Sequence, residues 1–266
     1  PTTKPKEVIL KIAVSVKQVP DTAAQVVVED GQITWGDASL IINPWDEYAV
    51  EAALQGAKAQ GGSVTVISMG PEDATEGLKH ALAMGCDEAV YISDPALKGL
   101  DSVGAARVLA AAIEKLGGVD LVFFGKQAVD SDSGMMASQV ARVLGWTALP
   151  MTSAITELSQ DSITVERSIE EGLQVVTSQL PATVSMTKDF GEPRYPSFMG
   201  IRKASRAQYP VWTLEDLGIE APTSVVSWPE VMNPPEREIV TEMITGDSPE
   251  EIAEKLADKI MEEKVL

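Results

Sequence analysis

Short apolar runs alternate with longer amphipathic stretches over the first 146 residues of the chain. The first of these runs is apolar and β-branched, which predicts a buried strand, and the other three are interpreted as strands as well. The four runs are ILKIAVSV (9–16), SVTVISMG (63–70), AVYIS (89–93) and DLVFFG (120–125). Strands that alternate with helices of about 10 to 16 residues are typical of parallel β-α-β units. We therefore predict an α/β fold over residues 8–146, with a doubly wound and mostly parallel sheet.

The stretches between these runs have the end signals of helices. We expect Asn43 to cap the first helix, because Asn is favoured at that position and Pro44 suits the first turn. Gly61-Gly62 ends the same helix. An earlier stretch, residues 25–35, has Asp-Gly between two β-prone runs and predicts a hairpin. Further helices are expected over 71–85, 101–118 and 131–146.

The periodicity changes after residue 150. Two β-prone runs flank Gln160-Asp161 and predict another hairpin, and residues 172–187 add two more strand-like runs. We expect all of these strands to be antiparallel and to extend or flank the same sheet. The stretch DFGEPRYPSFMGIRKASRAQYP (189–210) is rich in Pro, Gly and Arg, which predicts an exposed loop.

The C-terminal part of the chain has no domain-sized pattern. Residues 223–238 carry three prolines and predict an extended arm. Ser248 and Glu251 form a capping-box pattern before a short amphipathic helix with one apolar face. We expect three parts: an α/β domain (1–188), a partner-recognition loop (189–210), and an arm with a terminal helix (211–266) that docks on a partner.

The composition excludes several classes of protein. Forty acidic residues against 21 basic ones give a net charge of −19, which argues against nucleic acid as a partner. Any histidine-dependent hydrolysis would rest on His80, and His80 with Cys86 is too few for a zinc site without carboxylates. We expect His80 to face solvent and Cys86 to be a small buried side chain. Neither GxxxxGK[ST] nor GxGxxG occurs.

The same composition bears on the compartment. A single cysteine fits a reducing environment. No stretch approaches the ~18 uninterrupted apolar residues of a membrane helix, and the first residues lack a signal-peptide pattern. We expect a cytoplasmic protein that does not insert into a membrane.

The segment GKQAVDSDSG (125–134) is the strongest candidate for a ligand site. It follows a predicted strand and precedes a predicted helix, and open parallel sheets bind ligands at the carboxyl ends of their strands. Hydroxyls of Ser131 and Ser133, with N–H groups at the helix start, suit a phosphate. Of Asp130 and Asp132, we expect one to cap the helix and the other to accept a hydrogen bond from a ribose hydroxyl or an amide. The residues alone leave open that the segment only caps the helix.

A cluster of basic residues interrupts this acidic chain. Arg194, Arg202, Lys203 and Arg206 lie within one short stretch. Either they form a solvated loop or they form a recognition surface, and the contrast with the remaining charge favours recognition.

Five segments resemble the β subunit of electron transfer flavoprotein. They are VSVKQVPD (14–21), INPWDEYAVEAAL (42–54), ALAMGCDEA (81–89), GKQAVDSDSG (125–134) and EPRYPSFMGIRKA (192–204). The resemblance implies a Rossmann-like, adenine-nucleotide-binding fold and a heterodimer with a larger α subunit that holds the redox-active FAD. It also implies AMP as a structural ligand of this chain, and docking to acyl-CoA and related flavin dehydrogenases. No metal and no catalytic side chain is implied here, in line with an electron carrier.

The resemblance also implies site residues. The AMP contacts would be Ser15, Asn43, Pro44, Trp45, Asp46, Met69, Gly125, Lys126, Gln127, Ala128, Val129, Asp130, Ser131, Asp132, Ser133, Gly134, Met135 and Met136. The docking residues would be Glu192, Arg194, Tyr195, Phe198, Arg202 and Lys203, with Phe198 as the apolar anchor where leucine is more usual.

Two further interpretations remain open. AMP-binding members of the family tend to carry Asn-Gln-Thr where this chain has Gly134-Met135-Met136, and electron-bifurcating members, which hold a second FAD in place of AMP, tend to carry Asp-Gly-Asp-Thr-Ala-Gln. Gly145-Trp146 at the end of the next helix favours the AMP type. The third interpretation is a stand-alone nucleotide-binding protein of the universal-stress type, which would form a homodimer.

Overall fold

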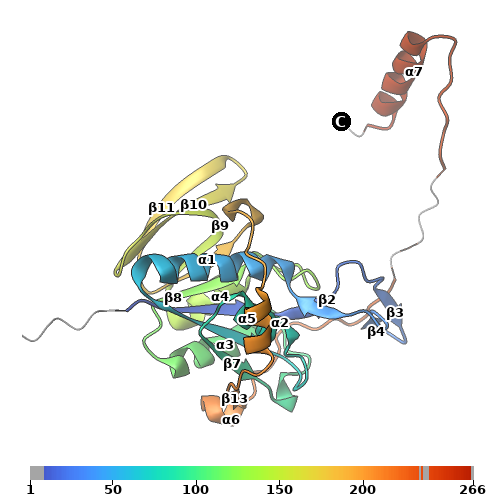
Figure 1. Cartoon of the computed structure of the whole chain (residues 1–266). Coiled ribbons are helices and arrows are strands. Elements are labelled where there is room, and N and C mark those ends of the chain that lie inside the picture. The colour runs from blue at the N-terminus through green and yellow to red at the C-terminus, as the bar shows by residue number, and fades with distance from the viewer. Residues whose placement is uncertain (1–8, 234, 236–239, 265–266) are drawn as a thin grey trace, which may run out of the picture. The chain divides into compact units, whose positions relative to one another are not determined.

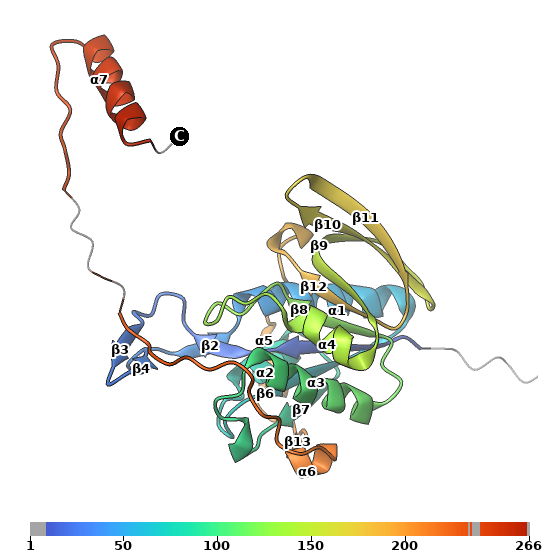
Figure 2. The same ribbon diagram turned by 180° about the vertical axis from the view of Figure 1, so that it is seen from behind.

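The computed structural model describes residues 9–233, 235 and 240–264. The chain divides into two units, Pro1–Glu230 and Val231–Leu266, which are described separately. The first unit is built on a nine-stranded sheet with helices on both faces (Figures 1 and 2). Its strand order is β11-β10-β9-β12-β8-β1-β6-β7-β13.

Parallel pairing dominates the sheet, as predicted. The strands that pair in parallel around its centre are β1 (Lys11–Val16), β6 (Ser63–Met69), β7 (Glu88–Ile92), β8 (Leu121–Gly125), β12 (Ala182–Met186) and β13 (Val211–Trp212). The antiparallel extension consists of β9 (Thr147–Leu158), β10 (Ser162–Ile169) and β11 (Gly172–Gln179). The predicted doubly wound α/β fold with an antiparallel extension is therefore confirmed.

One strand differs from the prediction. Residues of β12 were expected to pair in an antiparallel manner, but β12 runs parallel to β8 on one side and to β9 on the other. All five of its residues are buried. A strand inserted between two neighbours and covered on both faces has to be small or apolar throughout, which suits ATVSM.

Two helical layers cover the sheet. Helices α1 (Pro44–Gln60) and α2 (Glu76–Met84) share a buried cluster with Ile12 and Val14 of β1. Helices α3 (Ser102–Leu116) and α4 (Met136–Leu144) share a second cluster with Ala13. Successive side chains of a strand point to opposite faces, so β1 contributes to both layers. Helix α1 lies in front of the sheet in Figure 1 and α4 in Figure 2.

Smaller elements connect these layers. The hairpin expected near Asp30-Gly31 is confirmed as β3 (Val27–Glu29) and β4 (Gln32–Thr34). Strand β2 (Gln18–Pro20) pairs with β5 (Leu40–Ile42) just before α1. Single-turn elements complete the unit: η1 (Pro95–Leu97), η2 (Lys188–Phe190) and α6 (Leu214–Leu217).

The stretch predicted as an exposed loop contains a helix, α5 (Phe198–Ala204). It packs on α2, and Gly200 makes the close approach possible: a Cβ there would lie 2.2 Å from the carbonyl oxygen of Ala83. The Ser197 hydroxyl accepts a hydrogen bond from the Gly200 N–H and caps α5. The prediction failed because α5 leaves most of its apolar side chains exposed, so the sequence carries no buried stripe.

The second unit contains α7 (Pro249–Glu262), which confirms the predicted terminal helix. The Ser248 hydroxyl accepts from the Glu251 N–H at 3.2 Å, while the Glu251 carboxylate accepts from the Asp247 N–H. The described part of the predicted arm, residues 223–233 and 235, has no helix or strand. The rest of it (234 and 236–238) lies outside the described residues. Within the described chain, no helix is long and apolar enough to cross a membrane.

Candidate functional site

The segment 125–136 lies where the order of the sheet reverses. From β1 the chain moves through β6 to β7 on one side, and then returns to form β8 on the other side of β1. Ser15 of β1 is in register with Phe124 of β8, so the carboxyl ends of these strands are adjacent. This reversal is the point at which open α/β sheets bind ligands. Met69 lies at the carboxyl end of β6, the other neighbour of β1.

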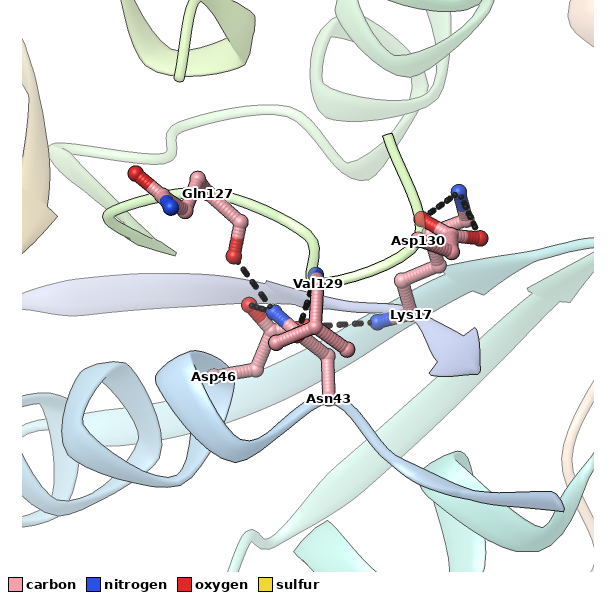
Figure 3. A network of polar contacts seen from close by, with 6 residues as sticks. All are labelled: Lys17, Asn43, Asp46, Gln127, Val129 and Asp130. Atoms are coloured by element: carbon pink, nitrogen blue, oxygen red, sulfur yellow. Dashed lines mark hydrogen bonds and ion pairs between the residues drawn. The ribbon is translucent and has the colours of Figure 1, made fainter. Parts of the chain in front are cut away.

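Asn43 holds the segment from below (Figure 3). Its Nδ2 donates to the Gln127 carbonyl at 2.8 Å and to Asp46 Oδ1 at 2.9 Å. Its Oδ1 accepts from the Val129 N–H at 3.2 Å. The residue occupies the N-cap position of α1, but its side chain makes no capping hydrogen bond. The predicted N-cap position is therefore confirmed, while the polar atoms of the side chain fix a distant loop instead of capping the helix.

Asp46 orients Asn43 and joins the site to β1. Its Oδ2 accepts from the Lys17 N–H at 2.7 Å. The side chain is buried, with the residue 6% exposed. Burial raises the pKa of Asp46 to about 7, although hydrogen bonds from Lys17, Asn43 and Gly125 favour the ionised form. The carboxyl group is thus poised to exchange its proton near neutral pH.

Gly125 allows this arrangement to close. A Cβ on Gly125 would lie 2.3 Å from Asp46 Oδ1 and 2.7 Å from the Trp45 carbonyl carbon. Any larger residue would push β8 and the start of α1 apart. The glycine that begins the GKQAVDSDSG motif is therefore required by packing, whatever the segment binds.

The two acids of the segment are engaged with side chains of the loop and of β1. Lys17 Nζ lies 2.7 Å from Asp130 Oδ2, which joins the loop to the end of β1. Gln127 donates to the Asp132 carboxylate, and Asp132 has a left-handed backbone with φ of 53°. Neither acid caps α4, whose N-cap position is taken by Met135 without a side-chain hydrogen bond. The expectation that one of them caps the helix is wrong, and so is the interpretation of the segment as a cap alone.

The outer side of the segment remains open. Residues 131–135 are exposed, and Lys126 Nζ lies 5.1 Å from the ring centroid of Trp45. Among the described residues, the N–H groups of 133–135 have no hydrogen-bond partner. They lie directly before the first turn of α4, where unpaired N–H groups and the helix dipole favour an anion. The predicted residues of this segment are therefore brought together: residues 131–135 are exposed, while Gln127 and Val129 contact Asn43 and Asp130 contacts Lys17.

The predicted docking residues form a second cluster around α5. Tyr195 is 92% exposed and Phe198 is 80% exposed. Met199 and Ile201, which the sequence reasoning did not select, are also exposed, and Glu192, Arg202 and Lys203 lie at the surface. We call Tyr195, Phe198, Met199 and Ile201 the apolar group. Four large apolar side chains exposed together are typical of a protein-binding patch.

Arg194 differs from the other predicted docking residues. Its guanidinium is bound to Glu51 of α1, with Nε 2.6 Å from Oε2 and Nη2 3.0 Å from Oε1. Sequence reasoning missed Glu51, which looks like an ordinary charged position of an amphipathic helix. Its pairing with a residue 143 positions away has no local signal.

The remaining candidates have structural surroundings. His80 was expected to face solvent, but it is half-buried and its Nε2 lies 2.9 Å from Glu47 Oε1. Cys86 is buried, as expected, and burial raises the pKa of its thiol to about 12. Such a thiol is not a reactive nucleophile.

Comparison with known proteins gives one family. Residues 34–217 match the family described as "Electron transfer flavoprotein domain". The chain is 35% identical over 267 residues to the caffeyl-CoA reductase-Etf complex subunit CarD of Acetobacterium woodii, a match that covers 97% of this chain and 100% of that relative.

Two further relatives carry the name electron transfer flavoprotein subunit beta. The one from Thermoanaerobacterium thermosaccharolyticum is 34% identical over 261 residues, covering 91% of this chain and 95% of its own length. The one from Megasphaera elsdenii is 33% identical over 273 residues, covering 97% and 100%. The resemblance inferred from the five motifs is confirmed. With this sheet, this loop and these relatives, the chain belongs to the electron transfer flavoprotein β-subunit family.

Proposed function

We propose that this chain is the β subunit of a heterodimeric electron transfer flavoprotein, that it binds AMP at segment 125–136, and that it docks flavin dehydrogenases through the apolar group. The FAD of the α subunit supplies the redox chemistry, and this chain supplies binding and orientation.

The observation that carries the nucleotide proposal is that some polar groups of the loop bind other parts of the protein while others have no protein partner among the described residues. Asn43 and Asp46 take up the inward-facing polar groups, so the loop is fixed before any ligand arrives. The unpaired N–H groups of 133–135 and the hydroxyls of Ser131 and Ser133, all at exposed residues, suit a phosphate. A site fixed in advance costs less entropy on binding.

The second candidate is FAD in place of AMP. The loop sequence favours testing it, because Gly134-Met135-Met136 stands where AMP-binding members of the family tend to carry Asn-Gln-Thr. Both nucleotides contain an adenosine phosphate, which is the part that the loop fits. The same geometry therefore supports either, and the number of flavins separates them.

The nucleotide content of the purified heterodimer tests the proposal directly. Co-expression with its α subunit, followed by acid release and chromatography of the nucleotides, should give FAD and AMP in equal amounts per heterodimer. Two FAD molecules and no AMP would establish the FAD alternative. A stable homodimer that binds nucleotide without a second chain would contradict the proposed heterodimer.

The docking proposal is tested by Phe198→Ala. Phe198 is 80% exposed, and burying such a side chain at an interface is worth about 2 kcal/mol, or roughly a 30-fold change in affinity. We expect the KM for an acyl-CoA dehydrogenase from the same organism to rise by about that factor, with the nucleotide content unchanged. Val143→Ala, at an exposed position of α4, is the matched control. Equal kinetics for both variants would contradict docking through the apolar group.

A further inference from the structure

Glu51 is a buried carboxylate that contacts both the side chain and the main chain of one distant arginine, Arg194. It lies in the middle of α1 and its side chain is 7% exposed, compared with 41% for Arg194. Besides both guanidinium bonds, Glu51 Oε2 accepts from the backbone N–H of Arg194 at 3.1 Å. Gln55 Nε2 donates to Oε1 at 2.8 Å. One carboxylate therefore fixes both the side chain and the main chain of residue 194.

The ion pair is maintained across the usual pH range. Burial opposes ionisation of Glu51, but the hydrogen bonds from Arg194 and Gln55 outweigh it and lower its pKa to about 2. A bidentate guanidinium–carboxylate pair is also geometrically specific, because two parallel hydrogen bonds set the orientation of both planes. Lysine could supply the charge but not this geometry.

Arg194 stands at one end of the apolar group, and the other end is fixed independently. Residues 191–197 have no regular secondary structure, so backbone hydrogen bonds of a helix or strand do not hold them. On the far side, Ser197 caps α5, and Gly200 packs against the Ala83 carbonyl of α2. The Glu51–Arg194 pair and the α2–α5 contact are thus the two attachments between which Tyr195 and Phe198 are presented.

We propose that Glu51 is a positioning residue for partner docking, which holds the apolar group in its binding arrangement through Arg194 without touching the partner. This rests on the docking function proposed above. It also assigns Arg194 to the framework of the docking surface, although its sequence neighbourhood marks it as a contact residue. Glu51 acts through α1, whose first turn carries Asn43 and Asp46, so one helix supports both the loop and the docking surface.

The test is Glu51→Gln in the intact heterodimer. Glutamine has the same size and can keep the contact with Gln55, but it replaces one acceptor oxygen by a donor that faces the guanidinium. We expect hydrogen–deuterium exchange of residues 192–204 to become about tenfold faster, the order expected for loss of a charge-assisted pair. The KM for the acyl-CoA dehydrogenase should rise by a similar factor, with kcat and the nucleotide content unchanged. Unchanged exchange in this segment would overturn the proposal.

Glu47→Gln is the matched control. It makes the same substitution on the same helix, and it replaces the carboxylate whose Oε1 lies 2.9 Å from His80 Nε2 instead. Exchange at 192–204 and the KM should both stay at the wild-type values. A rise in KM equal to that of Glu51→Gln would mean that any charge change on α1 has this effect, and it would also overturn the proposal.

A second variant keeps the test decisive if Glu51→Gln folds poorly. Arg194→Lys retains a cation beside the buried carboxylate and removes the bidentate geometry. The KM of the Glu51→Gln/Arg194→Lys double variant should be no higher than that of the poorer single variant, because both substitutions remove the same Glu51–Arg194 interaction. Additive losses would show that Arg194 contacts the partner directly, against the proposal.

Phe198→Ala, measured in parallel, separates the two proposals. If Phe198→Ala raises the KM and Glu51→Gln does not, docking holds and the positioning role fails. If neither variant changes the KM while exchange at 192–204 rises in Glu51→Gln, then Glu51 orders the segment but the docking function itself fails.

Discussion

At the scale of single residues, short polar side chains decide the shape of segment 125–136. Asn43 contacts a carbonyl 84 residues away, and Asp46 holds both Asn43 and the end of β1. The family resemblance implies that both residues touch the nucleotide. In the structure their polar atoms bind protein groups, which supports a role in fixing the loop. The same side chains create a buried carboxyl group whose ionisation is linked to stability.

That linkage gives a prediction for Asp46→Asn. The pKa of Asp46 is raised from 3.8 to about 7, so between these values the folded protein retains a proton that the unfolded chain has released. The free energy of unfolding of the wild type should therefore fall as the pH rises through this interval and level off above it. A pKa difference of one between the folded and unfolded states corresponds to about 1.4 kcal/mol. Between about pH 4 and pH 7 the free energy of unfolding of the wild type should therefore fall by several kcal/mol relative to that of Asp46→Asn.

Urea unfolding of wild type and Asp46→Asn at pH 5, 6, 7 and 8 measures this difference. Other titrating groups are shared by both proteins and cancel in the comparison. The free energy of unfolding of the wild type minus that of Asp46→Asn should decrease as the pH rises to about 7. Two parallel pH profiles would show that Asp46 is ionised throughout, with its N–H donors outweighing the cost of burial.

At the scale of elements, helices α1 and α3 make long-range attachments. The start of α1 carries the loop, the middle of α1 carries Arg194, and the start of α3 carries residues 224–226. Asp101 caps α3 by accepting from the Gly104 N–H at 2.7 Å. Its other oxygen accepts from the N–H groups of Val225 at 2.7 Å and Val226 at 3.0 Å. These bonds, that from Gly104 first, lower the pKa of Asp101. One carboxylate thus caps the start of α3 and also holds the segment that leads toward the second unit.

Asp101→Asn separates these two contacts. Asn caps helices about as well as Asp, so α3 should be retained. Its amide nitrogen cannot accept from Val225 and Val226, so the segment 222–230 should open more often. We expect limited proteolysis within 222–230 to be about two- to tenfold faster, the factor that a lost surface hydrogen bond produces.

Asp101→Ala is the comparison for that experiment, because it removes the helix cap as well. It should show the same faster cleavage together with a lower melting temperature, whereas Asp101→Asn should melt close to the wild type. Cleavage at the wild-type rate in both variants would show that other contacts hold the segment.

At the scale of the whole molecule, charge and topology favour a carrier that presents two surfaces. The chain has a net charge of −19, yet Arg202, Lys203 and Arg206 are exposed together in and just after α5. A local cationic patch on an acidic protein orients the approach of an oppositely charged partner. Segment 125–136 lies at the carboxyl ends of β1 and β8, and α5 packs on α2 on the face that α1 also covers. Helix α1 is the element common to the two sites.

Features that depend on local periodicity could be predicted from the sequence. The alternation of strands and helices, the β3–β4 hairpin, the antiparallel extension through β11 and the cap of α7 all follow from residues within a few positions of one another. Turn chemistry and the spacing of apolar residues act over that range. The family also followed from the sequence, because its motifs are continuous segments.

Tertiary structure decided the contacts between residues far apart in the chain. Only the folded sheet places β12 parallel between β8 and β9, since strand pairing depends on how the chain crosses the sheet. Only packing on α2 accounts for α5 within 189–210. Folding brought Asn43 within hydrogen-bond distance of Gln127 and Val129, and it brought Glu51 within hydrogen-bond distance of Arg194. Such pairs leave no periodic signal, since each partner is an ordinary polar residue in its own segment.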